Sequence, residues 1–249
     1  MTQPVLIDHV VFVLLAVIYP LYWKITWNRR VRSGIETGGS SARLAAYRHG
    51  IVGEWLLTGV IVVCWFLAER TPAELGFGAP RGWWFWIGCA VFIAYATLGM
   101  RQVAGLRASA EARSKVRDQL RGDVALIIPR NAVERRLFIA LSVTAGICEE
   151  VAYRGFLVWY LGAWLPAPAV VVAGAAIFGL AHLYLGWGHV LKTGAIGLVF
   201  VLAYLLTGTL WVPILLHATV DIVSGFAGHA AFDQPAEGTI LSANPPTAS

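Results

Sequence analysis

The sequence predicts an all-α fold, a polytopic bundle of about seven transmembrane helices, within a range of six to eight. The chain is 58% hydrophobic and only 13% charged, and its mean hydropathy is +0.67. Soluble globular domains have about 45–50% apolar and about 25% charged residues. Seven apolar segments of near-spanning length are the second observation. The third is the presence of eleven Trp, a residue that collects at membrane–water interfaces. Disordered chains, coiled coils and soluble enzymes do not have this composition.

The apolar segments define the elements in order, because a spanning helix needs about 20 mostly apolar residues. Three precede a long polar stretch and four follow it. They cover residues 5–23, 51–67, 83–100, 137–160, 169–184, 190–206 and 210–226. The fourth carries a charged cluster and either continues to Tyr160 or bends at Gly155, and Pro166 and Pro168 mark a turn before the fifth.

Three regions follow from this pattern. Residues 1–128 hold the first three helices and the basic loops, and residues 129–227 form a core that carries the unusual polar residues. Residues 228–249 are rich in Pro, Ala, Ser and Thr, and we expect a disordered tail.

The positive charge of the chain predicts its orientation in the membrane. The formal net charge is +5, and six Lys or Arg lie in residues 24–49, nine in residues 101–136 and only two in residues 69–82. Loops rich in Lys and Arg stay in the cytoplasm, so we expect the N-terminus outside and the C-terminus inside. The lipid bilayer, and not nucleic acid, is the expected partner of these charges. The three Cys match no zinc-ligand spacing, and their odd number argues against a disulfide framework.

Three ionisable residues interrupt the fourth apolar segment: Glu149, Glu150 and Arg154. Each costs about 2.5–3.5 kcal/mol at a helix centre, so three unpaired groups would cost on the order of 8 kcal/mol. Glu150 and Arg154 are four residues apart with the Glu first, the favourable order for an ion pair. Glu149 lies about 100° away on the face of Tyr153. A purely structural ion pair therefore leaves Glu149 unexplained, and we expect its carboxylate to face a cavity.

Two other apolar segments supply matching polar side chains. His182 ends one apolar stretch, and His217 and Asp221 share a face of another because they are four residues apart. A lone His in an apolar helix is usually a satisfied core residue. Polar residues from three membrane helices at similar depth instead indicate a functional site facing the bundle interior. The candidate catalytic residues are Glu149, His182, His217 and Asp221, and we therefore expect an active site inside the bundle.

These residues form motifs that resemble those of a known family. The run CEEVAYRGFL at 148–157 resembles the E-E-x-x-x-R motif of the CAAX proteases and bacteriocin-processing enzymes, the CPBP intramembrane endopeptidases. Phe178 and His182 are similar to its F-x-x-x-H motif, and His217 and Asp221 to its H-x-x-x-N/D motif. Residues 207–214 also resemble the run that precedes the third motif. The resemblance covers about residues 129–224, with three motifs in the family's order.

The resemblance implies hydrolysis of peptide bonds within the membrane. By position, Glu149 and His182 would activate water, and His217 and Asp221 would stabilise the oxyanion. The supporting residues would be Glu150, Arg154, Tyr153 and Phe178. Asp221 departs from the motif of the prenyl-protein endopeptidases, which have Asn at this position. An ionised carboxylate cannot donate a hydrogen bond to an oxyanion, whereas an amide can. Asp221 would have to be protonated or would have to orient His217.

Zinc is the alternative to a cofactor-free reaction. Two His and two carboxylates could hold the metal, with Glu149, His182, His217 and Asp221 as its ligands. However, the sequence lacks H-E-x-x-H and has no two His at i, i+4. The preferred hypothesis therefore requires no cofactor.

The leading hypothesis is an intramembrane endopeptidase acting on membrane-embedded or lipid-anchored peptides, in a multi-pass protein of a prokaryotic cytoplasmic membrane. The alternative is a non-catalytic immunity or partner-binding protein on the same scaffold, since fold does not fix function. A degenerate member would be expected to lose a motif residue, and this chain keeps all of them. A transporter or proton relay is less favoured, because the first three helices offer few matching polar elements. No substrate sequence and no oligomeric state are assigned.

Overall fold

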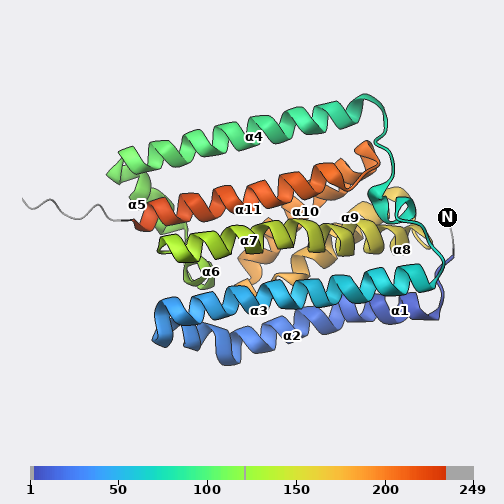
Figure 1. The fold of residues 1–249 in the computed structure, drawn as a ribbon, viewed down its shortest axis with the longest axis horizontal. Helices are drawn as coiled ribbons and strands as arrows, with labels where there is room; N and C mark the ends of the chain where they lie inside the picture. The colour runs from blue at the N-terminus through green and yellow to red at the C-terminus, as the bar shows by residue number, and fades with distance from the viewer. Residues whose placement is uncertain (1–2, 121, 234–249) are drawn as a thin grey trace, which may run out of the picture.

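The computed structural model describes residues 3–120 and 122–233, and all regular structure within these ranges is helical. The helices run side by side in one bundle. The start of the chain and the end of its last helix lie at opposite ends of it (Figure 1). The predicted all-α bundle is therefore confirmed.

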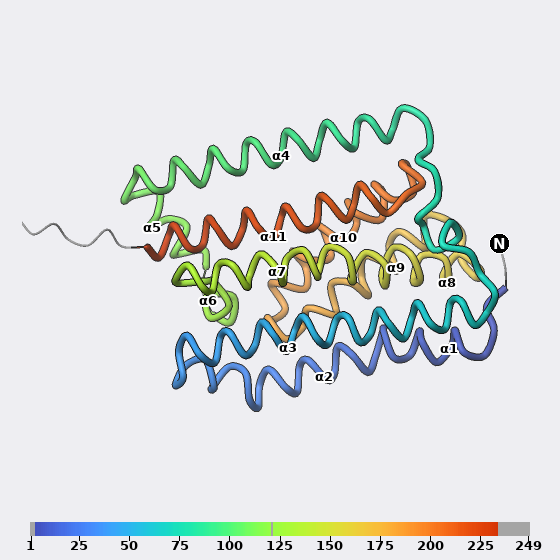
Figure 2. The backbone as a smooth tube through the Cα atoms, viewed as in Figure 1, coloured from blue at the N-terminus to red at the C-terminus, as the bar shows by residue number. Residues whose placement is uncertain are grey.

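The first two predicted spans form a continuous helical hairpin. Its elements are α1 (Leu6–Val13), η1 (Leu14–Ile18), α2 (Tyr19–Thr26), η2 (Trp27–Val31) and α3 (Arg32–Leu67). Figure 2 shows the chain reversing between α2 and α3. Within this stretch Gly39 leaves the helical region, with φ of 56° and ψ of −123°. The segment 24–49 was predicted as a loop and is helical instead. Gly39 alone supplies the turn, because glycine adopts positive φ without a Cβ clash.

The third predicted span is α4 (Gly82–Ala108), and two short helices follow it: α5 (Ala110–Gln119) and α6 (Asp123–Ile127). Ser109 separates α4 from α5 and caps the second helix, since its Oγ accepts a hydrogen bond from the Ala112 N–H at 3.2 Å.

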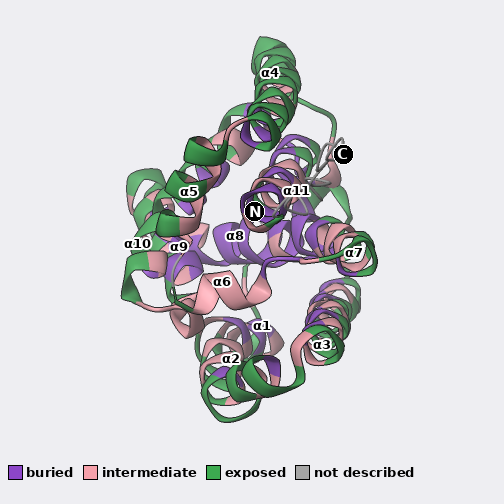
Figure 3. Ribbon diagram, turned by 90° about the vertical axis from the view of Figure 1, so that its left-hand side faces the viewer, coloured by how far each residue is buried: buried purple, intermediate pink, exposed green. Residues whose placement is uncertain are grey.

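The fourth predicted span is the middle of a long central rod, residues 132–162. It consists of α7 (Ala132–Glu149), the π-helix η4 (Glu150–Leu157) and α8 (Val158–Gly162). Asn131 caps its start by accepting a hydrogen bond from the Glu134 N–H at 2.9 Å. The rod does not bend at Gly155 but widens into η4 there. Every residue from Glu150 to Leu161 is buried (Figure 3), so the charged cluster lies at the centre of the protein.

The last three predicted spans complete the bundle as α9 (Ala167–Ala181), α10 (Trp187–Thr207) and α11 (Trp211–Phe232), with a 3₁₀ turn η5 (Leu183–Leu185) after α9. Helices α9 and α10 approach closely at Gly179, where a Cβ would lie 2.6 Å from the backbone oxygen of Val190. Small residues allow such close packing in membranes, where no hydrophobic force drives helices together.

The outer surface of the bundle is apolar. Large side chains point outward, including Leu6 at 80%, Trp86 at 71% and Leu191 at 76% exposure. Within residues 3–120 and 122–233, four helices are long and apolar enough to cross a membrane: Leu6–Leu67, which contains both legs of the hairpin, Gly82–Ala108, Trp187–Thr207 and Trp211–Phe232. Helix α9 is shorter, and α7 and η4 carry the charged cluster. Within that cluster Glu150 and Arg154 have no exposed surface, and the apolar outer faces of the bundle are suited to lipid.

The last helix corrects the predicted domain boundary. The tail was expected to begin at Gly228, but α11 continues to Phe232. Packing holds this turn: a Cβ at Gly228 would lie 2.7 Å from Ile128, and the His229 Nδ1–H donates to the Pro129 oxygen at 3.1 Å. Residues 234–249 lie outside the described part of the chain.

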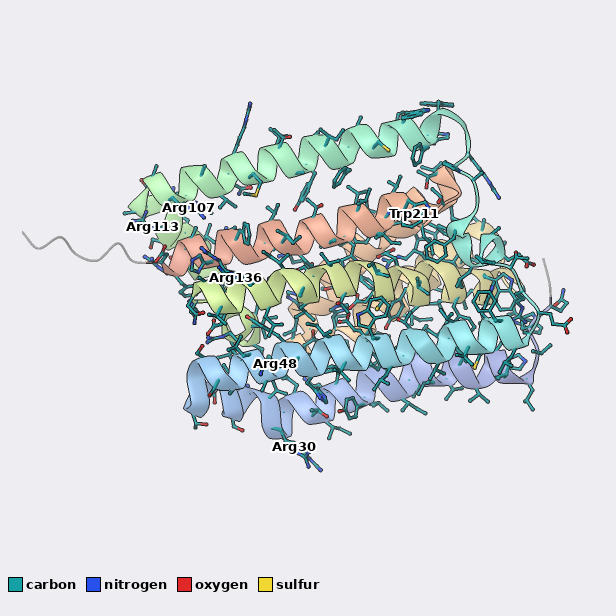
Figure 4. All side chains as sticks on the ribbon, in the orientation of Figure 1. Arg30, Arg48, Arg107, Arg113, Arg136 and Trp211 are labelled. Atoms are coloured by element: carbon teal, nitrogen blue, oxygen red, sulfur yellow. The ribbon has the colours of Figure 1, made fainter. Side chains whose placement is uncertain are left out.

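A buried ion pair fixes α3 to α7 at the basic end, where Arg107, Arg113 and Arg136 lie (Figure 4). Arg43 Nη1 donates to both carboxylate oxygens of Glu134 at 2.9 and 3.0 Å, and Arg43 Nε donates to the Leu126 oxygen at 2.7 Å. Burial alone would raise the pKa of Glu134. Hydrogen bonds from Ser40 and the Arg130 N–H, together with the Arg43 charge, nevertheless lower it below the usual 4.5. The same contacts hold α6 in place.

A second buried ion pair closes the opposite end of the bundle. Arg70 binds Asp8 through two hydrogen bonds of 2.7 Å, and its guanidinium lies 4.1 Å from the centre of the Trp159 ring. Asp8 was given no role from the sequence, and it joins α1 to the segment after α3.

Candidate active site

Glu149 is the last residue of α7, at the point where the central rod changes from α-helix to π-helix. Helices α7 and α11 touch one turn earlier. A Cβ at Gly146 would lie 2.9 Å from the Ala218 nitrogen and 3.0 Å from the Ile214 oxygen. This backbone contact brings Glu149 beside His217. Single π-turns within α-helices are frequent at functional sites.

Glu150 and Arg154 form a fully buried ion pair, as their spacing predicted. Arg154 Nη1 donates to Glu150 Oε1 at 2.9 Å, and both side chains have no exposed surface. Arg154 also donates to the Gly197 oxygen at 3.3 Å and lies 4.1 Å from the centre of the Phe178 ring. The charge is thus satisfied by contacts from α10 and α9, which ties three elements together.

Glu150 also binds His217, which the sequence did not reveal. His217 Nδ1 lies 2.7 Å from the same Oε1 that accepts from Arg154. Because this oxygen already accepts a hydrogen bond from Arg154, Nδ1 carries the proton and donates it, which turns Nε2 toward Glu149. Asp221 Oδ2 is 3.8 Å from Nε2, too far for a hydrogen bond, so the role of Asp221 toward His217 stays a prediction.

His182 follows the last residue of α9, where the helix ends. Its Nδ1 lies 3.0 Å from the Phe178 oxygen. A carbonyl can only accept, so Nδ1 carries the proton and neutral His182 presents a lone pair at Nε2. Phe178 packs edge-on against the His182, Tyr153 and His217 rings, with centroids 5.0, 5.0 and 6.0 Å apart. Phe178 is therefore the apolar support shared by these side chains.

The structure brings all four candidate catalytic residues together around Glu149. Its Oε2 lies 3.9 Å from His182 Nε2 and 3.8 Å from His217 Nε2. Among the described residues, this oxygen is buried and has no hydrogen-bond partner. The gaps are too long for direct hydrogen bonds but can be bridged by a small molecule such as water. Asp221 lies at the edge of the group, with 37% of its side chain exposed.

The group faces a cavity of about 290 Å³. The cavity continues from Glu149 toward the basic end, where Val124 and Ile127 of α6 line it. Several helices contribute aromatic walls to it. These are Tyr19, Trp23, Trp27, Tyr153, Phe178, Tyr184 and Phe200. The site is therefore a mostly apolar pocket with a few convergent polar groups, the usual form of a binding site for a small molecule or peptide.

Two polar side chains in this cavity had no predicted contact with substrate. Glu54 of α3 lines the cavity, and its Oε2 is buried without a hydrogen-bond partner in the described chain. Tyr153 was expected only to support the site, yet its hydroxyl is also buried and unpartnered. The sequence signal for Glu54 was a single carboxylate within an apolar segment, with no partner at helical spacing.

The four candidate residues contact one another in sequence, which bears on the zinc alternative. The contacts of 3.8–3.9 Å run from His182 to Glu149, from Glu149 to His217 and from His217 to Asp221. Within residues 3–120 and 122–233, no three His, Cys, Asp or Glu side chains are placed to hold a metal ion.

Comparison with known proteins adds one match. Residues 132–223 match the family described as type II CAAX prenyl endopeptidase Rce1-like. No curated protein and no solved structure matches the chain. The matched region runs from the start of α7 into α11 and contains all eight predicted site residues. The match supports the family predicted from the motifs, the CAAX proteases, over residues 132–223, and the long apolar helices are those of an integral membrane protein.

Proposed function

We propose that the chain hydrolyses peptide bonds of membrane-embedded or lipid-anchored substrates in the cytoplasmic membrane of a prokaryote. One observation carries the proposal. The buried, unpartnered Oε2 of Glu149 faces the Nε2 atoms of His182 and His217, at 3.9 and 3.8 Å. A carboxylate in this position, beside a basic nitrogen and within a cavity, suits general-base catalysis.

Water activation follows from the hydrogen-bonding capacity of the two residues. Glu149 as a carboxylate accepts only, and His182 accepts at Nε2 because its proton is held at Nδ1. A water between them donates one hydrogen to each and keeps its lone pairs free for a substrate carbonyl carbon. As the water oxygen forms its bond to that carbon, Glu149 takes the proton. The carbonyl π electrons move to the oxygen and create an oxyanion.

His217 is the donor for the oxyanion. Its Nδ1–H is bound to Glu150, so donation from Nε2 requires the doubly protonated imidazolium. The carboxylates of Glu150 at 2.7 Å and of Asp221 at 3.8 Å stabilise that positive charge. Glu149 then returns its proton to the amine as the carbon–nitrogen bond breaks, which leaves a free amine and a new carboxylic acid. The acid becomes a carboxylate when it gives its remaining proton to His182 Nε2 or to solvent.

Arg154, Glu150 and Phe178 act as positioning residues. The ion pair keeps Glu150 ionised, Glu150 fixes His217, and Phe178 packs against both histidine rings. A preorganised set of this kind stabilises the transition state without reorganising during the reaction. None of these steps uses zinc.

Cleavage of a peptide library in liposomes tests the proposal. Wild type and Glu149→Gln would be compared on membrane-anchored peptides, with Glu111→Gln as the control, since Glu111 is an exposed residue of α5 paired only with Lys115. We expect cleavage by wild type and Glu111→Gln and none by Glu149→Gln. Cleavage by Glu149→Gln at the wild-type rate would refute the assignment.

A further inference from the structure

The basic end of the bundle contains a second hollow that the proposed reaction does not use. It measures about 270 Å³. Its lining combines three arginines with apolar residues: Arg107, Arg135, Arg136, Ala132, Ile139 and Phe226. Arg107 belongs to the last turn of α4, whereas Arg135 and Arg136 belong to the first turns of α7. Figure 4 shows Arg107 and Arg136 at the same end of the protein.

The three guanidinium groups have no counterion within the described chain. No side-chain ion pair or hydrogen bond is made by Arg107, Arg135 or Arg136. Acidic residues of this end are engaged elsewhere. Glu36 and Asp123 contact Arg32, Glu111 contacts Lys115, and Glu134 contacts Arg43. Three like charges that share one hollow repel each other, and an anion placed between them would remove this repulsion.

The apolar part of the lining indicates the kind of anion. Ile139 and Phe226 lie next to the arginines and belong to helices α7 and α11, which continue into the apolar body of the bundle. A ligand with a charged phosphate and a hydrocarbon chain would satisfy both halves of the hollow. The planar guanidinium group of arginine can donate two parallel hydrogen bonds to a phosphate. Basic pockets between membrane helices on the cytoplasmic side bind anionic lipid headgroups.

We propose that this hollow binds the headgroup phosphate of an anionic phospholipid, with an acyl chain against Ile139 and Phe226. The bound lipid joins α4 to the central rod. Helix α4 packs mainly against α11, where Val103 and Leu106 meet Val223. A phosphate between Arg107 and Arg135 therefore adds a link from α4 to the rod that carries Glu149. This inference does not depend on the proposed proteolysis.

Lipid binding and thermal unfolding would test the site. The protein would be placed in nanodiscs of phosphatidylcholine with or without phosphatidylglycerol. A triple variant, Arg107→Gln, Arg135→Gln and Arg136→Gln, would be compared with a charge-matched triple, Arg29→Gln, Arg30→Gln and Arg101→Gln. The control arginines also lack a described side-chain partner and lie outside the hollow. At about 1 kcal/mol for each arginine, the first triple should bind phosphatidylglycerol on the order of 100-fold more weakly, and the control should bind nearly as wild type.

Three outcomes would overturn the proposal. An equal loss of phosphatidylglycerol affinity in both triple variants would indicate that the lipid responds to the general surface charge and not to this hollow. If phosphatidylglycerol did not raise the melting temperature of the wild type, the hollow would not be a lipid site. Equal stabilisation by soluble glycerol phosphate at the same concentration would indicate a free-phosphate site. If the first triple fails to fold, the single variant Arg107→Gln, at an exposed position, must still lower phosphatidylglycerol affinity more than Arg101→Gln does.

Discussion

Replacing Glu150 by Gln should unfold the protein more easily and disturb the site. The change removes the negative charge that Arg154 contacts at 2.9 Å and His217 at 2.7 Å. Gln can still accept one hydrogen bond, but Arg154 keeps a buried charge without an ionic partner. Removing one member of a buried ion pair costs about 3–5 kcal/mol.

That loss is large on the scale of the whole protein. Total unfolding free energies are about 5–15 kcal/mol. For a chain of this size each kcal/mol shifts the melting temperature by about 2–4 °C, so the expected shift is between roughly 6 and 20 °C. Cleavage should fall as well, because the charge that stabilises the His217 imidazolium is lost.

Thermal unfolding of a double-variant cycle is the assay. Glu150→Gln, Arg154→Gln and the combination would be compared in one detergent or nanodisc. We expect the double variant to lose less stability than the two single variants added together, because each single change strands a buried group. Additive losses, or an unchanged melting temperature for Glu150→Gln, would refute the reasoning.

The remaining predictions concern the oxyanion donor, the metal, helix packing and acid stability. His217→Ala should lose about 10²–10³ in turnover. Asp221→Asn should stay active, and chelators should not inhibit it. If Asp221 were a zinc ligand, chelators would inactivate wild type and the variant would be inactive. Gly146→Ala should be inactive while still inserting, because its Cβ would meet the α11 backbone at 2.9 Å, whereas Gly105→Ala, with nothing within 4 Å, should behave as wild type. The pKa of Glu134 is lowered from 4.5 in the folded state, so its stabilisation is present above that pH and is lost as the pH falls through the lower folded pKa. Glu134→Gln should lose this part of the acid dependence in unfolding curves and be less stable at neutral pH.

Much of the fold could be predicted from local pattern. Each of the seven apolar segments corresponds to helical structure in the described chain, and four described helices are long and apolar enough to cross a membrane. Backbone groups in lipid must be satisfied within a helix, which is why hydropathy locates such helices. The Glu150–Arg154 pair followed from i, i+4 spacing, which survives in η4. The helical extension of the hairpin across residues 24–49 could not be predicted from hydropathy, because the segment is polar and its only turn is Gly39.

Contacts between segments far apart in the sequence could not be predicted from the sequence pattern. His217 and Glu150 are separated by 67 positions, and nothing local shows that Nδ1 binds Glu150 and not Asp221. The same holds for Arg43 with Glu134 and for the position of Glu54 on the cavity wall. The motifs predicted that the site residues converge, but the contacts of each side chain depend on helix packing around residues such as Gly146.

The central claim is that Glu149 activates a water molecule that attacks the peptide bond directly. Single-turnover cleavage in H₂¹⁸O tests it, with the products and the digested enzyme analysed by mass spectrometry. The account predicts one ¹⁸O in the new carboxylate of the wild-type product, no ¹⁸O in the enzyme peptide that contains Glu149, and no product from Glu149→Gln. Label in the Glu149 carboxylate, which would indicate a covalent acyl-enzyme, or labelled product from Glu149→Gln, would contradict it.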